Sequence, residues 1–426
     1  MKAAAGLKGR LAASIFLFLF LGLFLPGENS LSAQVSGETG AITAISLSGL
    51  KRTRAFAAER PLKRFLGRDA EFLNYDEVRA VILDTGILEP LDVAVADNPE
   101  GPGKVLRVEV REKWSVFPLP LFFVSSGQIS AGGFFIDTNA FGINDKLFLG
   151  GMYLSRGWMV SGAYMHSPLR EHFPGWSLSG SFSRAERHDT DQREEDLRIF
   201  NLDSINVSLG LSYPLTDNLR ASLRFSYDEK LLRDHGAPLN APESGSRSLA
   251  AGPGLELRRS SYDGYFLSQE SASLGYAFTG GIGGSPSFHK IQWQGIYERS
   301  LIPGFRLVFR TGGVYAPRAP VLYETGPSAA GLNILPRFFS ARQYGGVSLG
   351  LEKYLFKISA GTLSILASYQ GGYSQGEILG YQFDHGLAGA LSFYLSKLAI
   401  PALGLGAAYN LPARFFQGSF TMGMSF

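Results

Sequence analysis

Cysteine is absent from all 426 residues of the sequence. Disulfide-stabilised folds are therefore excluded, and an exported protein of this sequence would have to fold without them. An excess of either charge is also missing, because 40 Lys and Arg residues stand against 37 Asp and Glu residues, for a formal net charge of +3. That balance is too mild to predict a nucleic-acid partner.

Long hydrophobic runs are missing except near the N-terminus, where "LAASIFLFLFLGLFLP" follows three basic residues. The basic segment, the apolar run and the small Ala33 predict a secretory signal peptide over residues 1–33, followed by a linker over residues 34–40. A retained membrane helix is the alternative. A lipoprotein anchor is excluded because no cysteine lies near the cleavage site. No later stretch approaches the roughly 20 apolar residues that a membrane helix needs.

Motifs for catalysis and cofactor binding are missing too. The six histidines have no metal-type spacing. The glycine-rich "GGIGGSP" lacks the Lys-Ser/Thr of a phosphate-binding loop, and Gly-x-Ser-x-Gly does not occur. The sequence therefore predicts no enzyme activity, no cofactor and no metal ion.

Residues 41–113 mix helical and strand patterns. "AITAISLSGL" predicts a strand, "TRAFAAERPLKRFLG" and "YDEVRAVILDTG" predict two helices, and two alternating segments around the loop "DNPEGPG" predict a β-hairpin. Asn74 and Glu77 have capping-box spacing at the second helix, and Gly86 lies where that helix should end. The order β-α-α-β-β predicts a small α+β domain.

After Trp114 the helical period gives way to alternation with a period of two. In "INVSLGLSYPL" and "NLRASLRFSYDEK", large apolar residues alternate with small or polar ones, and 52 glycines and an aromatic content of 13% suit many such strands. Segments of about 9 to 12 residues match tilted membrane-spanning strands. A β-sandwich could alternate in the same way, so periodicity alone leaves both folds open.

Connection lengths favour a barrel over a sandwich. We count about sixteen strands in residues 114–426, with short turns such as "TDN" and "IPG" after even-numbered strands and long connections after odd-numbered strands. The long connections include the charged run Arg184–Arg198, interpreted as a solvated surface loop, and the Pro-rich segment Ala316–Tyr344. The predicted fold is an all-β transmembrane barrel of antiparallel strands, preceded by the small α+β domain, with both barrel ends on the periplasmic side.

The first and last strands of this barrel carry unusual residues. In the last strand the even positions through Phe426 are mostly apolar, and the odd positions, such as Gly423, are small or polar, so the even side chains should face lipid. Backbone in hydrocarbon cannot remain unpaired, so this strand should close on the first. Pro118 and Pro120 cannot donate hydrogen bonds to a sheet. They predict either a weakly paired seam in the first strand or a rigid linker before a strand beginning at Leu121.

The α+β segment resembles a POTRA domain through "ISLSGLKRTR", "VILDTGILEPLDVAV" and "VLRVEVREKW". One POTRA domain followed by a sixteen-stranded barrel resembles the BamA/TamA superfamily of bacterial surface antigens over residues 41–426. POTRA modules of this family offer a sheet edge to unfolded strands, which is β-augmentation. The terminal strand ending in Phe426 looks like the signal that the assembly machinery reads. Another small α+β domain is the alternative for residues 41–113.

Two further stretches carry the resemblance. In "LEKYLFK", Glu352 matches the family's lumenal strand glutamate, and in "LPRFF", Arg337 and Phe339 match the arginine and the aromatic residue at the tip of a loop folded into the barrel. Two neighbours of Arg337 depart from the family pattern, and Gln370 stands in place of its aspartate. Because an arginine in the lumen needs a carboxylate, we expect Arg337 to pair with Glu352, with Gln370 as a neutral hydrogen-bond partner. A solvated Arg337 is the alternative.

The resemblance implies a bacterial outer-membrane protein with its POTRA domain in the periplasm. Such a protein would bind unfolded outer-membrane or exported polypeptides and pass them through a seam between the first and last strands. The lipid bilayer, periplasmic chaperones and accessory lipoproteins are the other implied partners. One alternative is a two-partner-type secretion pore, although the second POTRA module and the plugging helix usual in such proteins do not appear in the pattern. A non-transporting structural or adhesive barrel is the other.

Overall fold

The computed structural model describes the chain from residue 40 to residue 422, apart from short internal segments. The predicted signal peptide, nearly all of the predicted linker, and the site residues Arg337, Gly423 and Phe426 lie outside the described residues. The described ranges are 40–125, 128–166, 174–216, 218–233, 238–262, 267–326, 331–336, 338–358, 361–395 and 401–422.

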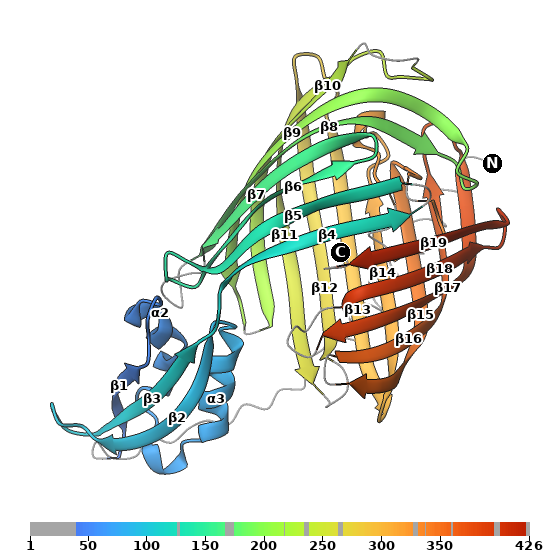
Figure 1. The fold of residues 1–426 in the computed structure, drawn as a ribbon. Coiled ribbons are helices and arrows are strands. Elements are labelled where there is room, and N and C mark those ends of the chain that lie inside the picture. The colour runs from blue at the N-terminus through green and yellow to red at the C-terminus, as the bar shows by residue number, and fades with distance from the viewer. Residues whose placement is uncertain are drawn as a thin grey trace, which may run out of the picture.

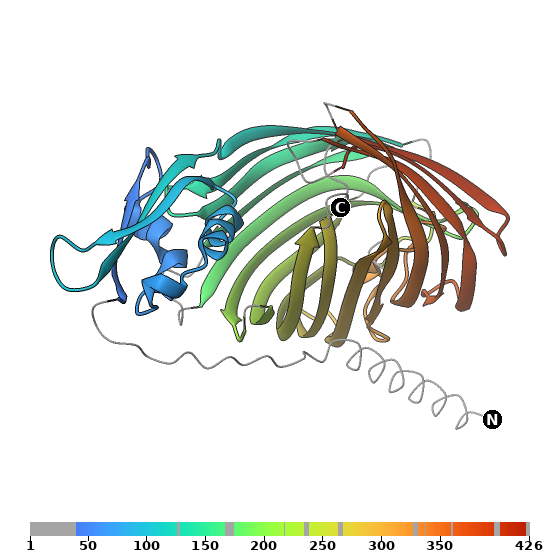
Figure 2. The same ribbon diagram turned by 90° about the horizontal axis from the view of Figure 1, so that it is seen from below.

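Two β-sheets form the described part of the chain (Figure 1). A three-stranded sheet lies toward the N-terminus, and sixteen antiparallel strands form a closed barrel whose last strand pairs with its first. Seen from below, the barrel strands curve around a common interior, with the small sheet beside one end (Figure 2). The predicted sixteen-stranded antiparallel sheet is confirmed. Within the described helices, none has the length and hydropathy needed to cross a membrane.

The N-terminal region, residues 40–115, has the order strand, helices, strand, strand. Its elements are β1 (Ile42–Ser48), α2 (Ala55–Glu59), η1 (Arg60–Phe65), η2 (Ala70–Phe72), α3 (Tyr75–Asp84), β2 (Leu88–Asp97) and β3 (Lys104–Glu112). The sheet order is β1-β3-β2, with β1 parallel to β3. Asn74 caps α3 by accepting hydrogen bonds from the backbone N–H groups of Asp76 and Glu77. Gly86, with a φ of +73°, follows the end of that helix.

Helix α3 and the small sheet share one apolar core. Val78 and Ile82, four residues apart on one face of α3, are at most 1% exposed, and Leu106 of β3 is fully buried. They form a cluster with Leu62 and Phe65 of η1. Burying a side chain of this size contributes about 1.5–3 kcal/mol, so this core stabilises the N-terminal region independently of the barrel.

The barrel strands differ widely in length, from 8 residues in the last strand to 19 in the sixth. They are β4 (Val116–Ser125), β5 (Gln128–Ala140), β6 (Asp145–Leu154), β7 (Gly157–His166), β8 (Gly175–Thr190), β9 (Asp196–Pro214), β10 (Leu219–Arg233), β11 (Ser246–Tyr262), β12 (Leu267–Ile282), β13 (Phe288–Ile302), β14 (Phe305–Tyr315), β15 (Gln343–Ile358), β16 (Gly361–Gln375), β17 (Tyr381–Leu395), β18 (Pro401–Asn410) and β19 (Phe415–Met422).

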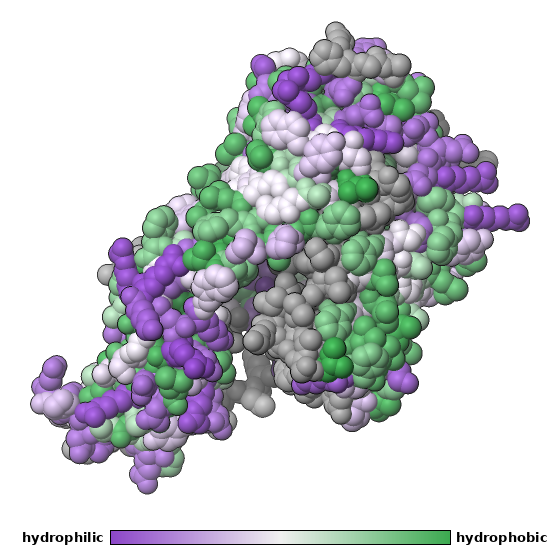
Figure 3. Space-filling view, in the orientation of Figure 1, coloured by the Kyte–Doolittle hydropathy of each residue, from purple (hydrophilic) through white to green (hydrophobic). Residues whose placement is uncertain are grey.

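The barrel has an apolar outer face and a polar inner face. On β16, Ile365 and Tyr369 are exposed, whereas the alternate residues Ser368 and Gln370 are buried. The strand register places outward residues side by side, as in Tyr369 and Leu387 of β17. Figure 3 shows hydrophobic residues gathered over the barrel strands and hydrophilic residues over the N-terminal region. This exterior is suited to contact with hydrocarbon.

The charged run Arg184–Arg198 is not the solvated surface loop that the sequence predicted. Most of it lies in β8 and β9, which remain paired as far as Thr190 and Asp196. Figure 1 shows these two long strands at the top of the barrel. Within the run, Asp189 and Arg198 are both only 4% exposed. The prediction was wrong because alternate residues of the run face the interior, where other charges pair with them.

The N-terminal region is attached to the barrel by polar contacts. Arg52, in the loop after β1, forms an ion pair with Asp137 of β5 at 2.5 Å. Asn139, next along the same strand, donates a hydrogen bond to the Thr53 hydroxyl at 2.8 Å. Asp137 and Asn139 are both buried. The orientation of the N-terminal region is therefore fixed by side chains and not only by the connecting chain.

The carboxylate of Glu112 organises the loop that makes this contact. It accepts hydrogen bonds from the backbone N–H groups of Lys51, Arg52 and Thr53 at 2.7–3.1 Å. Burial acts to raise the pKa of Glu112, but the three donors outweigh it and hold the pKa below its ordinary value. An ionised Glu112 therefore keeps Arg52 where it can pair with Asp137.

Candidate functional site: the lumenal loop and the seam

We call the connection between β14 and β15, residues 316–342, the lumenal loop, because its described residues (316–326, 331–336 and 338–342) lie inside the barrel. It contains one short helical turn, η3 (Val321–Tyr323). Described residues of this loop form hydrogen bonds with β8, β9, β11, β16 and β19. These strands are distributed around the whole closed barrel. A segment that contacts all of them must cross the interior.

A network of buried charges holds one part of the lumenal loop. Arg198 of β9 pairs with Asp189 of β8 at 3.0 Å and with Glu324 of the loop at 3.4 Å. Arg198 also pairs with Glu377, in the connection between β16 and β17, at 3.3 Å. Arg342 pairs with Glu324 at 3.3 Å and with Glu377 at 2.9 Å. Because an unpaired buried charge is costly, removing one of the buried members would destabilise the others.

Glu324 is the residue of the lumenal loop at the centre of this network. In addition to its two arginine partners, it accepts a hydrogen bond from the backbone N–H of Glu377 at 2.9 Å. Burial raises the pKa of Glu324 above its ordinary value, and the nearby Asp189 carboxylate acts in the same direction. Arg198 and Arg342 lower the pKa and so oppose the protonation that burial favours.

Neighbouring contacts show which strand residues face the lumen. Arg187 of β8 donates hydrogen bonds to two carbonyl oxygens of the lumenal loop at 3.1 Å. The Tyr323 hydroxyl lies 2.7 Å from the Ser248 hydroxyl of β11, and Lys230 of β10 lies over the Tyr323 ring. The ring of Phe288 in β13 packs against the same tyrosine. Since side chains alternate along a strand, the even-numbered residues of β10, β11 and β13 face inward.

Apolar packing fixes the middle of the lumenal loop. The predicted site residue Phe339 is 1% exposed and packs in a cluster with Leu332 and Ile334 of the loop and with Tyr344 of β15. Gly346 of β15 leaves room for this cluster, because a Cβ added there would lie 2.5 Å from the Leu332 side chain. Close packing of this kind leaves the loop one well-defined position.

Two glutamines attach the lumenal loop to the barrel wall. Gln370 of β16 is 2% exposed, and its Oε1 accepts a hydrogen bond from the backbone N–H of Asn333 at 2.7 Å. Gln417 of β19 donates from Nε2 to the carbonyl oxygens of Asn333 and Leu335, the latter at 2.9 Å. One short stretch of the loop is therefore held both by β16 and by the closing strand.

Glu352 of β15 is buried in a second group of charges. It pairs with Arg306 of β14 at 2.7 Å and accepts a hydrogen bond from the Ser364 hydroxyl at 2.5 Å. Arg306 also pairs with Glu298 of β13 at 2.9 Å. Arg337, which the sequence predicts as the partner of Glu352, lies outside the described residues, so that pairing stays a prediction.

The seam between β4 and β19 has few described pairs. The two strands pair from Phe122 to Ser125 on β4 and from Ser419 to Met422 on β19, which is four residues on each. On its other side β4 pairs with β5 over ten residues, from Val116 to Ser125. The ring of Phe122 contacts the ring of Phe420 across the seam. The described residues of β19 end at Met422, so the described part of this ladder ends there as well.

Pro118 and Pro120 lie within β4, not in a linker before Leu121. The carbonyl oxygen of Leu119 points toward β5, where it would lie 3.3 Å from a Cβ added to Gly133. Backbone groups of successive residues in an antiparallel strand point to opposite sides. The nitrogens of both prolines therefore face the side on which β19 pairs. Because proline has no N–H, this edge lacks two donors.

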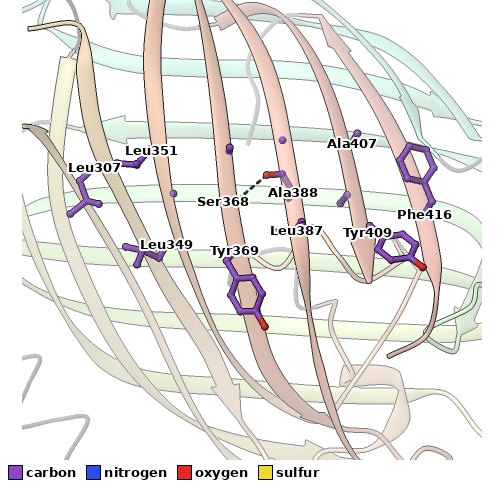
Figure 4. Close-up of a pocket in the computed structure, with 14 residues that line it drawn as sticks. Leu307, Leu349, Leu351, Ser368, Tyr369, Leu387, Ala388, Ala407, Tyr409 and Phe416 are labelled. Atoms are coloured by element: carbon purple, nitrogen blue, oxygen red, sulfur yellow. Dashed lines mark hydrogen bonds between the residues drawn. The ribbon is translucent and has the colours of Figure 1, made fainter. Parts of the chain in front are cut away.

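An apolar groove of about 760 Å³ adjoins the closing strand on the outer face of β14–β19. Figure 4 shows Leu349, Tyr369, Leu387 and Phe416 among its lining side chains. These are outward-facing residues, and Phe416 is 65% exposed. The groove therefore belongs to the apolar exterior of the barrel and not to its lumen.

Sequence reasoning missed the residues that hold the lumenal loop. It singled out Glu352 and Gln370, but not Glu324, Arg198 or Arg306. The alternation within β8 and β9 was the available signal, since Arg198 shares its face with apolar residues that are buried. Among the described His, Asp and Glu side chains, no group of three or more could hold a metal ion.

Comparison with known proteins finds structures of similar fold but no protein of similar sequence. No protein-family model and no curated protein matches the chain. Its structure is similar to BamA from Haemophilus ducreyi lacking POTRA domains 1–3, with a TM-score of 0.60 and 14% identity, covering 92% of this chain and 85% of that one. CdiB from Acinetobacter baumannii gives 0.63 and 14%, covering 91% and 74%. CdiB from Escherichia coli gives 0.62 and 16%, covering 90% and 76%.

The closed barrel of sixteen antiparallel strands and its inward loop define the structural class of the chain. The fold is that of BamA and CdiB, which confirms the predicted BamA/TamA-type resemblance at the level of the fold. At 14–16% identity, the likeness extends to the fold and not to a substrate.

Proposed function

We propose that the protein is an outer-membrane factor that moves polypeptide chains into or across the membrane, with residues 41–113 acting as a periplasmic POTRA domain. The observation that carries this proposal is the seam. The edge of β4 at the seam lacks two donors, because the nitrogens of Pro118 and Pro120 face the side on which β19 pairs. A strand edge that is short of partners is suited to separate and to pair with another chain.

In this proposal an unfolded chain is captured before it reaches the barrel. The small sheet has the order β1-β3-β2, so β1 and β2 are edge strands to which an extended peptide can add. The captured chain then pairs with the β4 edge at the opened seam. No nucleotide is needed, because the free energy comes from apolar side chains entering lipid and from strand edges becoming paired.

A second candidate function, a secretion pore of the two-partner type, is favoured by a different observation. Inward-facing residues of β10, including Ser222 and Arg224, are exposed to water. In the sixteen-stranded order, β10–β13 lie opposite the seam between β19 and β4. A water-accessible wall far from the seam suits passage through the lumen. The fold is also that of CdiB.

A disulfide across the seam tests the first candidate. Phe123 and Thr421 face each other across the seam, and the chain has no cysteine of its own. The backbone groups of Phe123 point to β5, so this pair is not hydrogen-bonded, and its Cα atoms should be about 4.5 Å apart, within disulfide range. We expect oxidised F123C/T421C to fold, to lose insertion activity, and to regain it on reduction.

A matched crosslink provides the control for the seam variant. Phe148 of β6 and Ala163 of β7 also face each other, away from the seam. Oxidised F148C/A163C should keep full activity. If both oxidised variants remain fully active, the seam does not open during function, and the lumenal route is favoured instead.

A depletion strain separates the candidate functions in the cell. Loss of many barrel proteins from the outer membrane would support assembly. Loss of one exported protein would support secretion through the lumen. An unchanged set of envelope and exported proteins would contradict both candidates and leave a structural or adhesive barrel.

A further inference from the structure

One side of the lumen wall carries positive charges that form no ion pair within the described residues. The inward residues of β10, β11 and β13 include five cations, and three of them, Arg220, Arg224 and Arg258, are exposed although they face the interior. Exposure of an inward side chain means that water occupies the space in front of it. The five cations are Arg220, Arg224, Lys230, Arg258 and Lys290.

These cations have few partners within the described residues. Arg220, Arg224, Arg258 and Lys290 form no ion pair and no side-chain hydrogen bond there, and Lys230 forms no ion pair but contacts the Tyr323 ring. The neighbouring acids Asp228 and Glu256 form no ion pair with them within the described residues, although the Asp228 carboxylate lies close enough to act electrostatically on Lys230 and Lys290. Asp228 accepts hydrogen bonds from Asn206 at 2.7 Å and Ser226 at 3.4 Å, and Glu256 forms no ion pair with its cross-strand neighbour Arg220.

Between Arg224 and Lys290 the inner surface of the barrel wall carries no large side chain. Arg224 pairs in register with Gly252 of β11, and Lys290 pairs with Ala277 of β12. Gly252 lies directly beside Ala277, because a Cβ added to Gly252 would be 2.7 Å from the Ala277 Cα. Strands about 4.8 Å apart set the Cα atoms of Arg224 and Lys290 at about 14 Å. Their long side chains thus converge over a shallow floor of backbone and methyl groups.

We propose that this wall binds the carboxylate groups of an acidic polypeptide segment as it passes along the lumen. A water-filled cleft with walls of low dielectric constant and charges of one sign concentrates the opposite charge, and rings of Arg and Lys select for anions in pores. The exposed Ser and Gln residues beside these cations, such as Ser222 and Gln292, offer hydrogen bonds without competing charge. The inference rests on the proposed function, because it takes the ligand to be part of a transported chain.

A fluorescent polyglutamate peptide measures this site directly. A peptide of about ten residues would span the roughly 30 Å of the membrane core in extended form. We expect it to bind the purified full-length protein in detergent at low salt and to dissociate as salt is added. A polyglutamine peptide of the same length should not bind. Failure of polyglutamate to bind, or equal binding of polyglutamine, would overturn the proposal.

Charge reversal in the lumen should weaken the binding. In R224E/K290E we expect affinity to fall about tenfold or more, because like charges repel, and the neutral R224Q/K290Q should lie between it and the original protein. The matched control K63E/R107E makes the same change in net charge on exposed residues of the N-terminal region and should bind normally. Equal weakening in both charge-reversed variants would show a general charge effect and overturn the site.

Ion selectivity gives a second readout that needs no peptide. In planar bilayers under a potassium chloride gradient, the reversal potential of the original protein should favour chloride, and that of R224E/K290E should shift toward potassium. An unchanged reversal potential would contradict the proposal. If the peptide and chloride results hold while a depletion strain shows no defect in assembly or export, the anion site stands and the proposed function fails.

Discussion

On β16, the inward side chains of Ser364 and Gln370 are at most 2% exposed, whereas on β10 the inward side chains of Ser222 and Arg224 are open to water. Both strands belong to one barrel and have the same alternation. The difference is the lumenal loop. It packs against β15, β16 and β19, whereas its described hydrogen bonds and ring contacts with β10, β11 and β13 are made by Tyr323 alone, with residues near one end of each strand. We therefore treat β14–β19 and β10–β13 as two walls. We call these the covered wall and the open wall.

Charged side chains form ion pairs on the covered wall, whereas the inward cations of the open wall have none within the described residues. On the covered wall, Arg306 and Glu352 form a buried ion pair, and Arg306 also pairs with the buried Glu298 of the adjacent strand β13. On the open wall, Arg220 and Arg224 have no ion pair within the described residues. A charge removed from water must be paired, while a hydrated charge need not be. Paired charges therefore mark the part of the wall from which water is excluded. Cations without an ion pair mark the part that water reaches.

Removing one charge from each wall should give the largest contrast. Arg306→Ala leaves Glu298 and Glu352 buried without their shared partner and should cost about 3–5 kcal/mol. Arg224→Ala removes a hydrated side chain and should cost about 0.5 kcal/mol or less. The temperature at which the folded, heat-modifiable form is lost on gels measures both. Equal shifts for the two variants would remove the distinction between the walls.

Glu352→Gln tests the same group of charges by a smaller change. It keeps the shape of the side chain and its hydrogen bond with Ser364 but leaves Arg306 with one carboxylate fewer. We expect lower heat stability and slower assembly than in the original protein. If neither changes, Glu352 does not have the structural role that its burial indicates.

Glu324→Ala should loosen the lumenal loop and so make the covered wall more like the open wall. It leaves Arg198 with fewer carboxylate partners in a buried place and should cost about 3 kcal/mol. Single-channel recordings should show more frequent or larger openings. The control is Glu243→Ala, an exposed carboxylate in the connection between β10 and β11, which should change neither conductance nor stability. Indistinguishable recordings for the two variants would contradict this role of Glu324.

Replacing one glycine on each wall should change stability by unequal amounts, with a difference smaller than that for the charge substitutions. Gly346→Ala on the covered wall would place a Cβ 2.5 Å from Leu332 and should cost about 1–3 kcal/mol through overpacking. Gly275→Ala on the open wall meets only the far part of the Gln292 side chain, at 3.3 Å or more, and should be tolerated. Thermal unfolding monitored by near-ultraviolet circular dichroism compares them. If Gly275→Ala destabilised the protein more than Gly346→Ala, the description of the two walls as covered and open would be contradicted.

The smallest effect concerns a carboxylate that is held by backbone donors and not by an arginine. Because the pKa of Glu112 is lowered in the folded protein, its ionised form stabilises the junction above the ordinary pKa of 4.5, and this contribution is lost as pH falls through the lowered value. Limited proteolysis between the N-terminal region and the barrel should increase over that acidic range. Glu112→Gln should be cleaved similarly at all pH values. A wild-type profile without pH dependence would contradict this account.

The sequence was sufficient to predict the barrel architecture and to predict which face of each strand points inward. Alternation and connection lengths gave sixteen antiparallel strands, and Gln417 and Phe416 face inward and outward as expected. Both follow from local rules, because side chains alternate along any strand and solvent or lipid acts on each residue separately. The inward course of the β14–β15 connection was expected only from the resemblance of "LPRFF" to the family's loop, not from the strand pattern.

The pairing of buried charges could not be predicted in the same way. Arg198 and Glu324 are 126 residues apart, and nothing local in either segment identifies the other. The charged run in β8 and β9 was assigned to solvent because charge usually lies there. Only the inward course of the lumenal loop makes burial of Asp189 and Arg198 possible. Such contacts depend on tertiary structure, which local patterns do not specify.

The amide of Gln417 has a thermodynamic consequence. It lies on β19, the strand that must leave β4 if the seam opens, yet it donates to two carbonyl oxygens of the lumenal loop. Opening at the seam and release of the loop therefore share an interaction energy, and such a coupling is reciprocal. Whatever loosens the loop should ease separation of the first and last strands by the same amount, so a ligand acting deep in the channel could influence events at the lipid boundary.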